Sequence, residues 1–88
     1  MAESFRLSVV TGEGTVFEGT VDYVNLPTAF GSVGILAHHA DMLCAVEKGV
    51  IRCRREDRTQ FIETASGVAN IGNNEVTVLV PNAKVREE

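Results

Sequence analysis

Short stretches of alternating apolar and polar residues, separated by turn residues, recur along the whole chain. In residues 5–10, Phe5, Leu7 and Val9 fall on one side of an extended backbone and the residues between them on the other. No window has the three-to-four-residue apolar spacing of an amphipathic helix over the length that a helix needs. The pattern therefore predicts an all-β fold, a small antiparallel β-sandwich or flattened barrel in which two sheets share one apolar core.

Turn residues divide the chain into eight or nine expected strands. The strands are expected at residues 5–10, 15–18, 21–26, 33–37, 41–47, 50–55, 59–65, 68–71 and 75–80. Gly19 breaks the second, and Pro27, which has no amide hydrogen, marks the end or edge of the third. A hairpin tip at residues 56–57 would place Ile51 opposite Ile62. The turn at residues 72–74 is the clearest, because Gly and Asn tolerate positive φ.

The length and net charge of the chain limit the classes of protein to which it can belong. With 88 residues, the chain is expected to form one domain over residues 1–83, followed by a charged tail at residues 84–88 without order of its own. The net charge of -4 argues against a protein that tracks nucleic-acid phosphates. No apolar run approaches the roughly 20 residues of a membrane span, and the N-terminus lacks the pattern of a signal peptide. We therefore expect a chain that folds in the cytoplasm without inserting into a membrane.

Residues 31–43 are the most unevenly built stretch of the chain. Gly31 and Gly34 suggest a tight turn or a close backbone approach, and the adjacent His38 and His39 invite a metal or catalytic interpretation. Adjacent histidines in a strand point to opposite faces, so the two cannot grip one ion without a bend. A structural or interfacial role is therefore the preferred interpretation.

Other candidate sites are weaker still. Cys44 and Cys53 lack the spacing of a zinc or redox motif, and we expect two reduced, buried or half-buried thiols. Ser32 and Ser66 stand beside glycine but precede no helix, so neither forms a nucleophile elbow. Residues 12–14 lack the third glycine and the helix of a dinucleotide site. The residues thus predict no enzyme, no cofactor, no metal and no small-molecule substrate.

One basic cluster, the arginine hairpin, consists of Arg52, Arg54, Arg55 and Arg58. The simplest interpretation is a solvated tip neutralised by the acidic residues between the two strands. The alternative is a free-standing regulatory sandwich that binds an anionic partner through this hairpin. That alternative predicts binding that weakens steeply as salt rises.

Several motifs occur in one order along the chain. They are Gly31-x-x-Gly-Ile-Leu-x-x-His-Ala-x-x-Leu43, Lys48-Gly-Val-Ile-Arg52, Ser66-Gly67 and Asn74-x-Val-Thr-Val-Leu79, preceded by the related segments 5–10 and 16–24. Over residues 5–83 the series resembles the N-terminal β-sandwich domain of the epsilon subunit of F-type ATP synthase. The resemblance implies a flattened sandwich of about ten strands.

The resemblance also implies a function. Epsilon is a non-catalytic subunit of the central stalk, or rotor, and it links the gamma subunit to the c ring in a complex that couples proton or sodium-ion flow to ATP synthesis. Its place is the cytoplasmic face of the membrane, as a peripheral part of the membrane-bound complex. The implied partners are therefore gamma and the c-ring subunits.

The resemblance also implies which residues contact the c ring and which contact gamma. By position, residues facing the c ring would be Phe30, Gly31, Ser32, Val33, Gly34 and His39. Residues facing gamma would be Thr11, Met42 and Leu43. An apolar Met-Leu step suits the dry centre of a protein contact.

The chain departs from the family pattern at three places. Ala37 and Asp41 stand where the family commonly has proline, which makes the turn less rigid. Ser66 stands where relatives carry the first of two glycines. The sequence ends at Glu88, whereas relatives continue into a C-terminal helical hairpin that inhibits ATP hydrolysis and, in some members, binds ATP. A chain ending here is expected to lack both properties.

Overall fold

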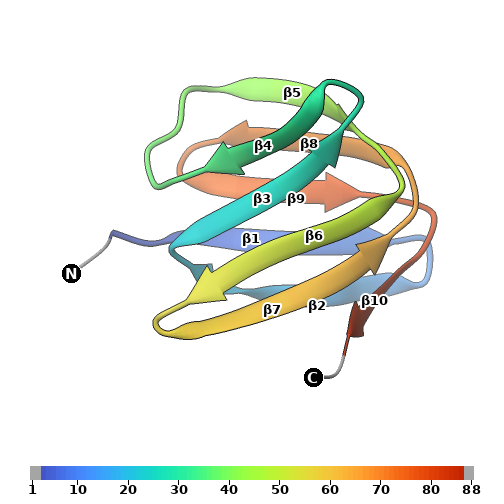
Figure 1. Ribbon diagram of the computed structural model, residues 1–88, viewed down its shortest axis with the longest axis horizontal. Helices are drawn as coiled ribbons and strands as arrows, with labels where there is room; N and C mark the ends of the chain where they lie inside the picture. Colours follow the sequence, from blue (N-terminus) through green and yellow to red (C-terminus); the bar gives the residue numbers. More distant parts are fainter. Residues whose placement is uncertain (1–2, 87–88) are drawn as a thin grey trace.

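Ten β-strands in two five-stranded sheets form the computed structural model of the chain, which describes residues 3–86 (Figure 1). The strands are β1 (Phe5–Thr11), β2 (Gly14–Val21), β3 (Tyr23–Thr28), β4 (Gly31–Ile35), β5 (Met42–Val46), β6 (Gly49–Arg55), β7 (Arg58–Thr64), β8 (Gly67–Gly72), β9 (Glu75–Leu79) and β10 (Ala83–Arg86). Sheet A has the order β2-β1-β9-β8-β5 and sheet B the order β10-β7-β6-β3-β4. The predicted all-β sandwich of about ten strands is confirmed. Within residues 3–86, no helix is long and apolar enough to cross a membrane.

The inner faces of the two sheets form one core because inward and outward side chains alternate along the strands. The buried apolar residues are Phe5, Leu7, Val9, Val21, Val24, Leu26, Ile35, Val46, Ile51, Cys53, Ile62, Ala69, Ile71, Val76, Val78 and Val80. Ile51 pairs with Ile62 across the β6–β7 hairpin, as predicted, and both are fully buried. This pair fixes the register that turns Arg52 and Arg54 of β6 away from the core, whereas Arg55 at the end of the strand reaches across to β2.

One strand pair departs from the expected antiparallel arrangement. β1 runs parallel to β9, with Leu7 opposite Val76 and Val9 opposite Val78. Every other strand pair found within residues 3–86 is antiparallel. The four paired side chains are buried, so this parallel contact joins the first and the ninth strand inside sheet A.

Two expected strand breaks do not occur. β2 continues through Gly19, which pairs with Leu7. β3 continues through Pro27, which pairs with Ser32 of the edge strand β4. Pro27 lies beyond Asn25, the last β3 residue paired with β6, so its missing amide hydrogen interrupts no ladder.

The expected disordered tail is corrected in part, because Lys84 and Arg86 belong to β10. This strand pairs with β7, and its Val85 packs against the core opposite Ile62. Nε of Arg86 lies 3.1 Å from a carboxylate oxygen of Glu63. The alternation of charged and apolar residues thus produces an edge strand, and residues 87–88 lie outside the described part of the chain.

The connections gather at the two ends of the sandwich. The β4–β5 loop, the β6–β7 hairpin and the β8–β9 turn lie at the left end of Figure 1, and the β3–β4 turn lies at the right end. The edge strands β4 and β5 follow each other in sequence, one in each sheet. The predicted contact residues therefore lie on or beside one edge of the sandwich, with the exception of Thr11.

Candidate functional site

An apolar patch covers part of the outer face of sheet A. The sheet A patch consists of Val10, Leu43, Ala45, Val68 and Leu79, from four adjacent strands. The register places Val68 between Ala45 and Leu79, and Leu43 two residues along β5. Leu43 is 71% exposed and Leu79 50%. A contiguous exposed apolar surface of this kind is typical of a protein contact site.

The patch has polar neighbours on the same face. Leu43 of the patch pairs with Asn70, which pairs in turn with Thr77. Farther along, the guanidinium of Arg6 lies 3.0 Å from the carboxylate of Glu18. An apolar centre bordered by polar and charged groups is the usual composition of a protein interface.

The three residues assigned to gamma by resemblance do not share one face. Leu43 lies in the patch, whereas Met42 points to the other side of β5 and packs, half-buried, against the core. Thr11 ends β1, which is separated from β5 by the two strands β9 and β8, and its hydroxyl donates to the carbonyl of Gly14 at 3.2 Å. Of the three, Leu43 is the one that the structure presents fully for contact.

The β3–β4 turn presents Phe30, whose exposure is 101%. The turn is held by Thr28, whose hydroxyl donates to the carbonyl of Gly31 and accepts the amide hydrogen of Phe30. Gly31 has φ of 107°, a conformation that L side chains rarely adopt. The Phe30 ring therefore lies exposed on a hydrogen-bonded turn. The backbone conformation of Gly31 explains why this position is a glycine.

The remaining predicted residues of β4 have different environments. Ser32 is exposed, while Val33 is half-buried against the core. A Cβ on Gly34 would lie 3.0 Å from the hydroxyl of Tyr23. Gly34 thus makes room for the Tyr23 ring on the outer face of sheet B.

His39 lies apart from Phe30. β4 separates the β3–β4 turn from the β4–β5 loop, and its five residues span roughly 16 Å at the usual rise of a strand. His39 is half-buried, with its Nδ1 2.7 Å from the carbonyl oxygen of Ala40. A surface that includes both residues must run along β4, because one loop tip cannot contain them.

The arginine hairpin is divided among different contacts. Arg54 Nε lies 2.8 Å from Asp22 Oδ1, and Arg55 Nε donates to the carbonyl of Thr20 at 2.9 Å. Arg52 lies over the ring of Tyr23, with its guanidinium carbon 5.9 Å from the centroid. The partner of Arg54 is thus a carboxylate of the β2–β3 link and not one at the hairpin tip.

The phenol of Tyr23 belongs to the same cluster on the outer face of sheet B. The Asn25 amide donates to the phenol oxygen at 3.3 Å, and this bond, together with the neighbouring Arg52 guanidinium, lowers the pKa of Tyr23. The guanidinium carbon of Arg54 also lies over the Tyr23 ring, 5.4 Å from its centroid. Two arginines are therefore occupied by aromatic and carboxylate neighbours within the fold.

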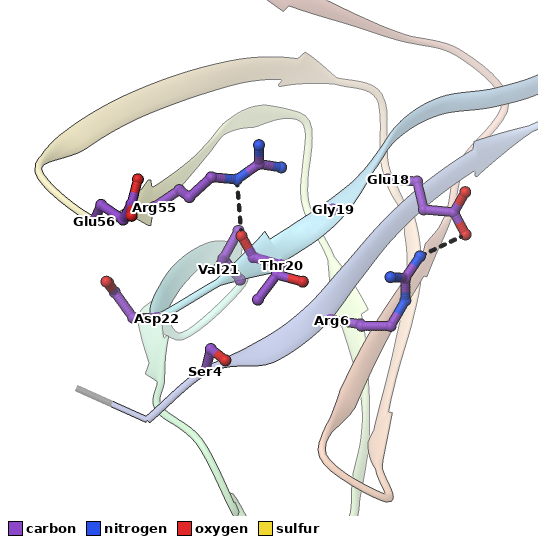
Figure 2. A pocket seen from close by; sticks show the side chains of 9 residues that line it. All are labelled: Ser4, Arg6, Glu18, Gly19, Thr20, Val21, Asp22, Arg55 and Glu56. Carbon is purple, nitrogen blue, oxygen red and sulfur yellow. Dashed lines mark hydrogen bonds and ion pairs between the residues drawn. The ribbon is translucent and has the colours of Figure 1, made fainter. Parts of the chain in front are cut away.

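A depression of about 620 Å³ lies beside β2, and Figure 2 shows the side chains that line it. Arg6 and Arg55 contribute positive charge, and Glu18, Asp22 and Glu56 contribute negative charge. In Figure 2 the two arginines bind Glu18 and the Thr20 carbonyl on different sides of β2 and do not converge on one point. Within residues 3–86 no group of three potential metal ligands is found.

The two thiols differ in burial. Cys53 is fully buried in β6, and burial raises its pKa to about 11. Cys44 is half-buried in β5, and burial raises its pKa as well. A raised pKa keeps a thiol protonated and unreactive at neutral pH.

Comparison with known proteins identifies the family. The family model described as "ATP synthase, Delta/Epsilon chain, beta-sandwich domain" matches residues 4–86. The ATP synthase epsilon chain of Desulfitobacterium hafniense (strain Y51) is 36% identical over 88 residues, which are 100% of this chain and 67% of the relative. That of Prochloron didemni is 42% identical over 82 residues, 93% of this chain and 60% of the relative. The chain thus spans about two thirds or less of these relatives.

Two solved structures have a similar fold. A chain in the Euglena gracilis mitochondrial ATP synthase structure "OSCP/F1/c-ring in rotational state 1" matches with a TM-score of 0.87 and 16% identity, over 93% of this chain and 53% of that one. A chain of the Tetrahymena thermophila mitochondrial ATP synthase "central stalk/cring" structure matches with a TM-score of 0.77 and 11% identity, over 93% and 66%. These likenesses concern the fold. From the match over residues 4–86, the chain belongs to the family of the β-sandwich domain of the ATP synthase delta/epsilon chain.

Proposed function

We propose that this chain is a non-catalytic central-stalk subunit of an F-type ATP synthase that links gamma to the c ring. The epsilon chains among its relatives and the central-stalk structure with a similar fold support the assignment. The observation that carries it is the sheet A patch, an exposed apolar surface on an otherwise acidic chain. A surface of this kind is typical of a protein contact and involves no reacting group.

Gamma is the proposed partner of the sheet A patch. Leu43 and Leu79 supply exposed apolar area, and Asn70 and Thr77 supply polar groups beside it. The patch lies on a paired four-strand surface, so binding would order little further backbone. A preformed surface of this kind suits a permanent contact that must transmit force.

The c ring is the proposed partner of the β4 edge. Phe30 at one end of β4 and His39 beyond the other end would be covered together only by a contact that runs along the strand. Ser32 is exposed between them. The proposed c-ring contact is therefore an elongated strip, with Phe30 as its aromatic anchor.

The proposed mechanism is mechanical. The two surfaces adjoin where β4 leads into β5, and both rest on the same close-packed core. Close-packed interiors deform little under load. A rotation imposed at the β4 edge would thus be passed to gamma by a rigid body, with the catalytic sites on other subunits and this chain held peripherally at the membrane.

Co-purification from the native host tests this function. The chain is tagged at Glu88, the membranes are solubilised gently, and the recovered gamma and c subunits are quantified. Recovery of both at low and moderate salt is the expected result. Recovery of the chain alone from the soluble fraction would overturn the proposal and favour the anionic-partner alternative of the arginine hairpin.

A further inference from the structure

We propose that Asn74 is the positioning residue that fixes the β4–β5 loop, and with it His39, at the junction of the two contact surfaces. Asn74 lies in the β8–β9 turn and belongs to neither the sheet A patch nor the β4 edge. The part of this inference that concerns binding rests on the proposed function. The part that concerns the loop rests on hydrogen bonds within the chain alone.

The side chain of Asn74 bonds two segments that are far apart in sequence. Its Oδ1 accepts the amide hydrogen of His38 at 2.8 Å, across 36 residues. Its Nδ2 donates to the carbonyl of Ser4 at 2.9 Å, across 70 residues. Its own carbonyl accepts the amide hydrogen of Arg6 at 3.3 Å. One residue therefore ties the β4–β5 loop and the N-terminal segment to the β8–β9 turn.

Asparagine has the properties that this position needs. It offers one acceptor and one donor at the end of a short side chain, and the amide of His38 and the carbonyl of Ser4 require that combination. Asn74 also has φ of 59°, a left-handed conformation that asparagine adopts more readily than most residues. Aspartate would lose the donor, and glycine would keep only the backbone conformation.

The loop itself requires a restraint from outside. His38 has φ of 63°, a left-handed conformation that costs free energy in any residue with a side chain and is kept where the surroundings hold it. The His38 ring contacts the carboxylate of Glu3, next to Ser4. The Asn74 side chain thus restrains the backbone near both partners of this contact. It bonds the His38 amide directly, and it bonds the carbonyl of Ser4, the residue after Glu3.

The hydrogen bond from the His38 amide to Asn74, here called the clamp, affects the proposed contacts because the contact residues follow His38 closely in sequence. His39 follows the clamped His38, and Leu43 of the sheet A patch comes four residues later. Figure 1 shows the β4–β5 loop bridging the edges of the two sheets at the end where the β8–β9 turn and the N-terminal segment also lie. Loss of this hydrogen bond would therefore let His39 move relative to β4. The sheet A patch would stay in place, because its strands are paired with one another.

Amide hydrogen exchange of the isolated 88-residue chain tests the clamp itself. In Asn74→Gly, which preserves the left-handed backbone, exchange of the His38 amide should accelerate about tenfold. In Asn74→Asp, whose carboxylate can still accept that hydrogen, protection of His38 should return. Asn73→Gly, at the neighbouring turn position with φ of 53°, is the matched control and should leave His38 unchanged.

Two results would overturn the clamp. One is unchanged protection of His38 in Asn74→Gly, and the other is failure of Asn74→Asp to restore it. If Asn74→Gly does not fold, the wild-type chain decides: a His38 amide that exchanges as fast as an unbonded peptide amide would overturn the clamp. Exchange at buried core amides such as that of Ile71 distinguishes loop release from general loss of stability.

Co-purification of the tagged chain tests the consequence for binding. Asn74→Gly should lower the recovered c subunits several-fold relative to gamma, and Asn74→Asp should restore the ratio. Equal loss of both partners would overturn the positioning role. If the wild-type chain recovers neither partner, the proposed function fails, while the exchange measurement still decides whether Asn74 holds the loop.

Discussion

Gly19 of β2 and Arg55 of β6 are in contact across the gap between the two sheets. A Cβ on Gly19 would overlap Nη2 of Arg55, whose Nε donates to the carbonyl of the adjacent Thr20. The glycine therefore leaves the space in which the guanidinium lies against an edge strand, as Figure 2 shows. The absent side chain of Gly19 thus explains how the hairpin of sheet B is attached to sheet A.

Replacing Gly19 by alanine tests this attachment. Gly19→Ala should displace the guanidinium and lose its bond to Thr20, at a cost of about 1 kcal/mol in the free energy of unfolding. The cost stays small because the obstructing atom is at the end of a flexible side chain. Urea denaturation measures the change. In an Arg55→Ala background the same substitution should cost nothing, and an equal cost in both backgrounds would contradict the account.

Gly67 should respond more strongly to the same substitution. A Cβ at Gly67 would overlap the carbonyl oxygen of Leu79 and the side chain of Val80, and a backbone atom cannot swing aside. Gly67→Ala should therefore cost roughly 1–3 kcal/mol in the free energy of unfolding, as overpacking does elsewhere. Gly12→Ala is the control, because nothing lies within 4 Å of its added Cβ. A neutral Gly67→Ala would show that β8 and β9 can move apart there.

Neighbouring residues of β5 should separate binding from stability. Leu43 is exposed in the sheet A patch, so Leu43→Asp should leave the free energy of unfolding within about 0.5 kcal/mol. It should lower recovery of gamma with the tagged chain roughly tenfold, as loss of a central apolar contact does. Met42→Asp, one residue away but packed on the core, should instead destabilise the chain. Unfolding of Leu43→Asp would place Leu43 in the core and contradict its assignment to an interface.

Local patterns predicted most of the fold because alternation and turn chemistry are local. The register of Ile51 with Ile62 and the positive φ of Asn73 and Asn74 are both confirmed. The presence of a glycine inside β2 could not be explained from local sequence, because the space that Gly19 leaves is occupied by Arg55, 36 residues away. The parallel pairing of β1 with β9 likewise depends on residues at opposite ends of the chain.

The same distinction applies to the candidate site. Resemblance indicated Leu43 and Phe30, and the structure exposes both. It also grouped Met42 with Leu43, although alternation alone sends adjacent strand residues to opposite faces. The patch residues Val68 and Leu79 were missed, because strands separated in sequence assemble them. Exposed positions in alternating strands were the available signal, but their side-by-side order requires the sheet topology.

The buried thiol of Cys53 should make stability fall at alkaline pH. Burial raises its pKa to about 11 in the folded chain, whereas an unfolded cysteine ionises near the ordinary value of 9.0. Between these values the folded state binds more protons, so the free energy of unfolding decreases as the pH rises, by up to roughly 2–3 kcal/mol. Below pH 9 the contribution is fully present and constant.

Urea denaturation of the wild type and of Cys53→Ala between pH 8 and pH 11 measures this dependence. The alanine variant should be less stable throughout, since it loses a buried sulfur, but its curve should be flatter. Tyr23, whose pKa is lowered by Asn25 and Arg52, acts with the opposite sign in both proteins and cancels in the difference. Parallel curves would mean that the Cys53 thiol ionises as readily in the folded chain as in the unfolded one, and that β6 opens enough to let water reach it.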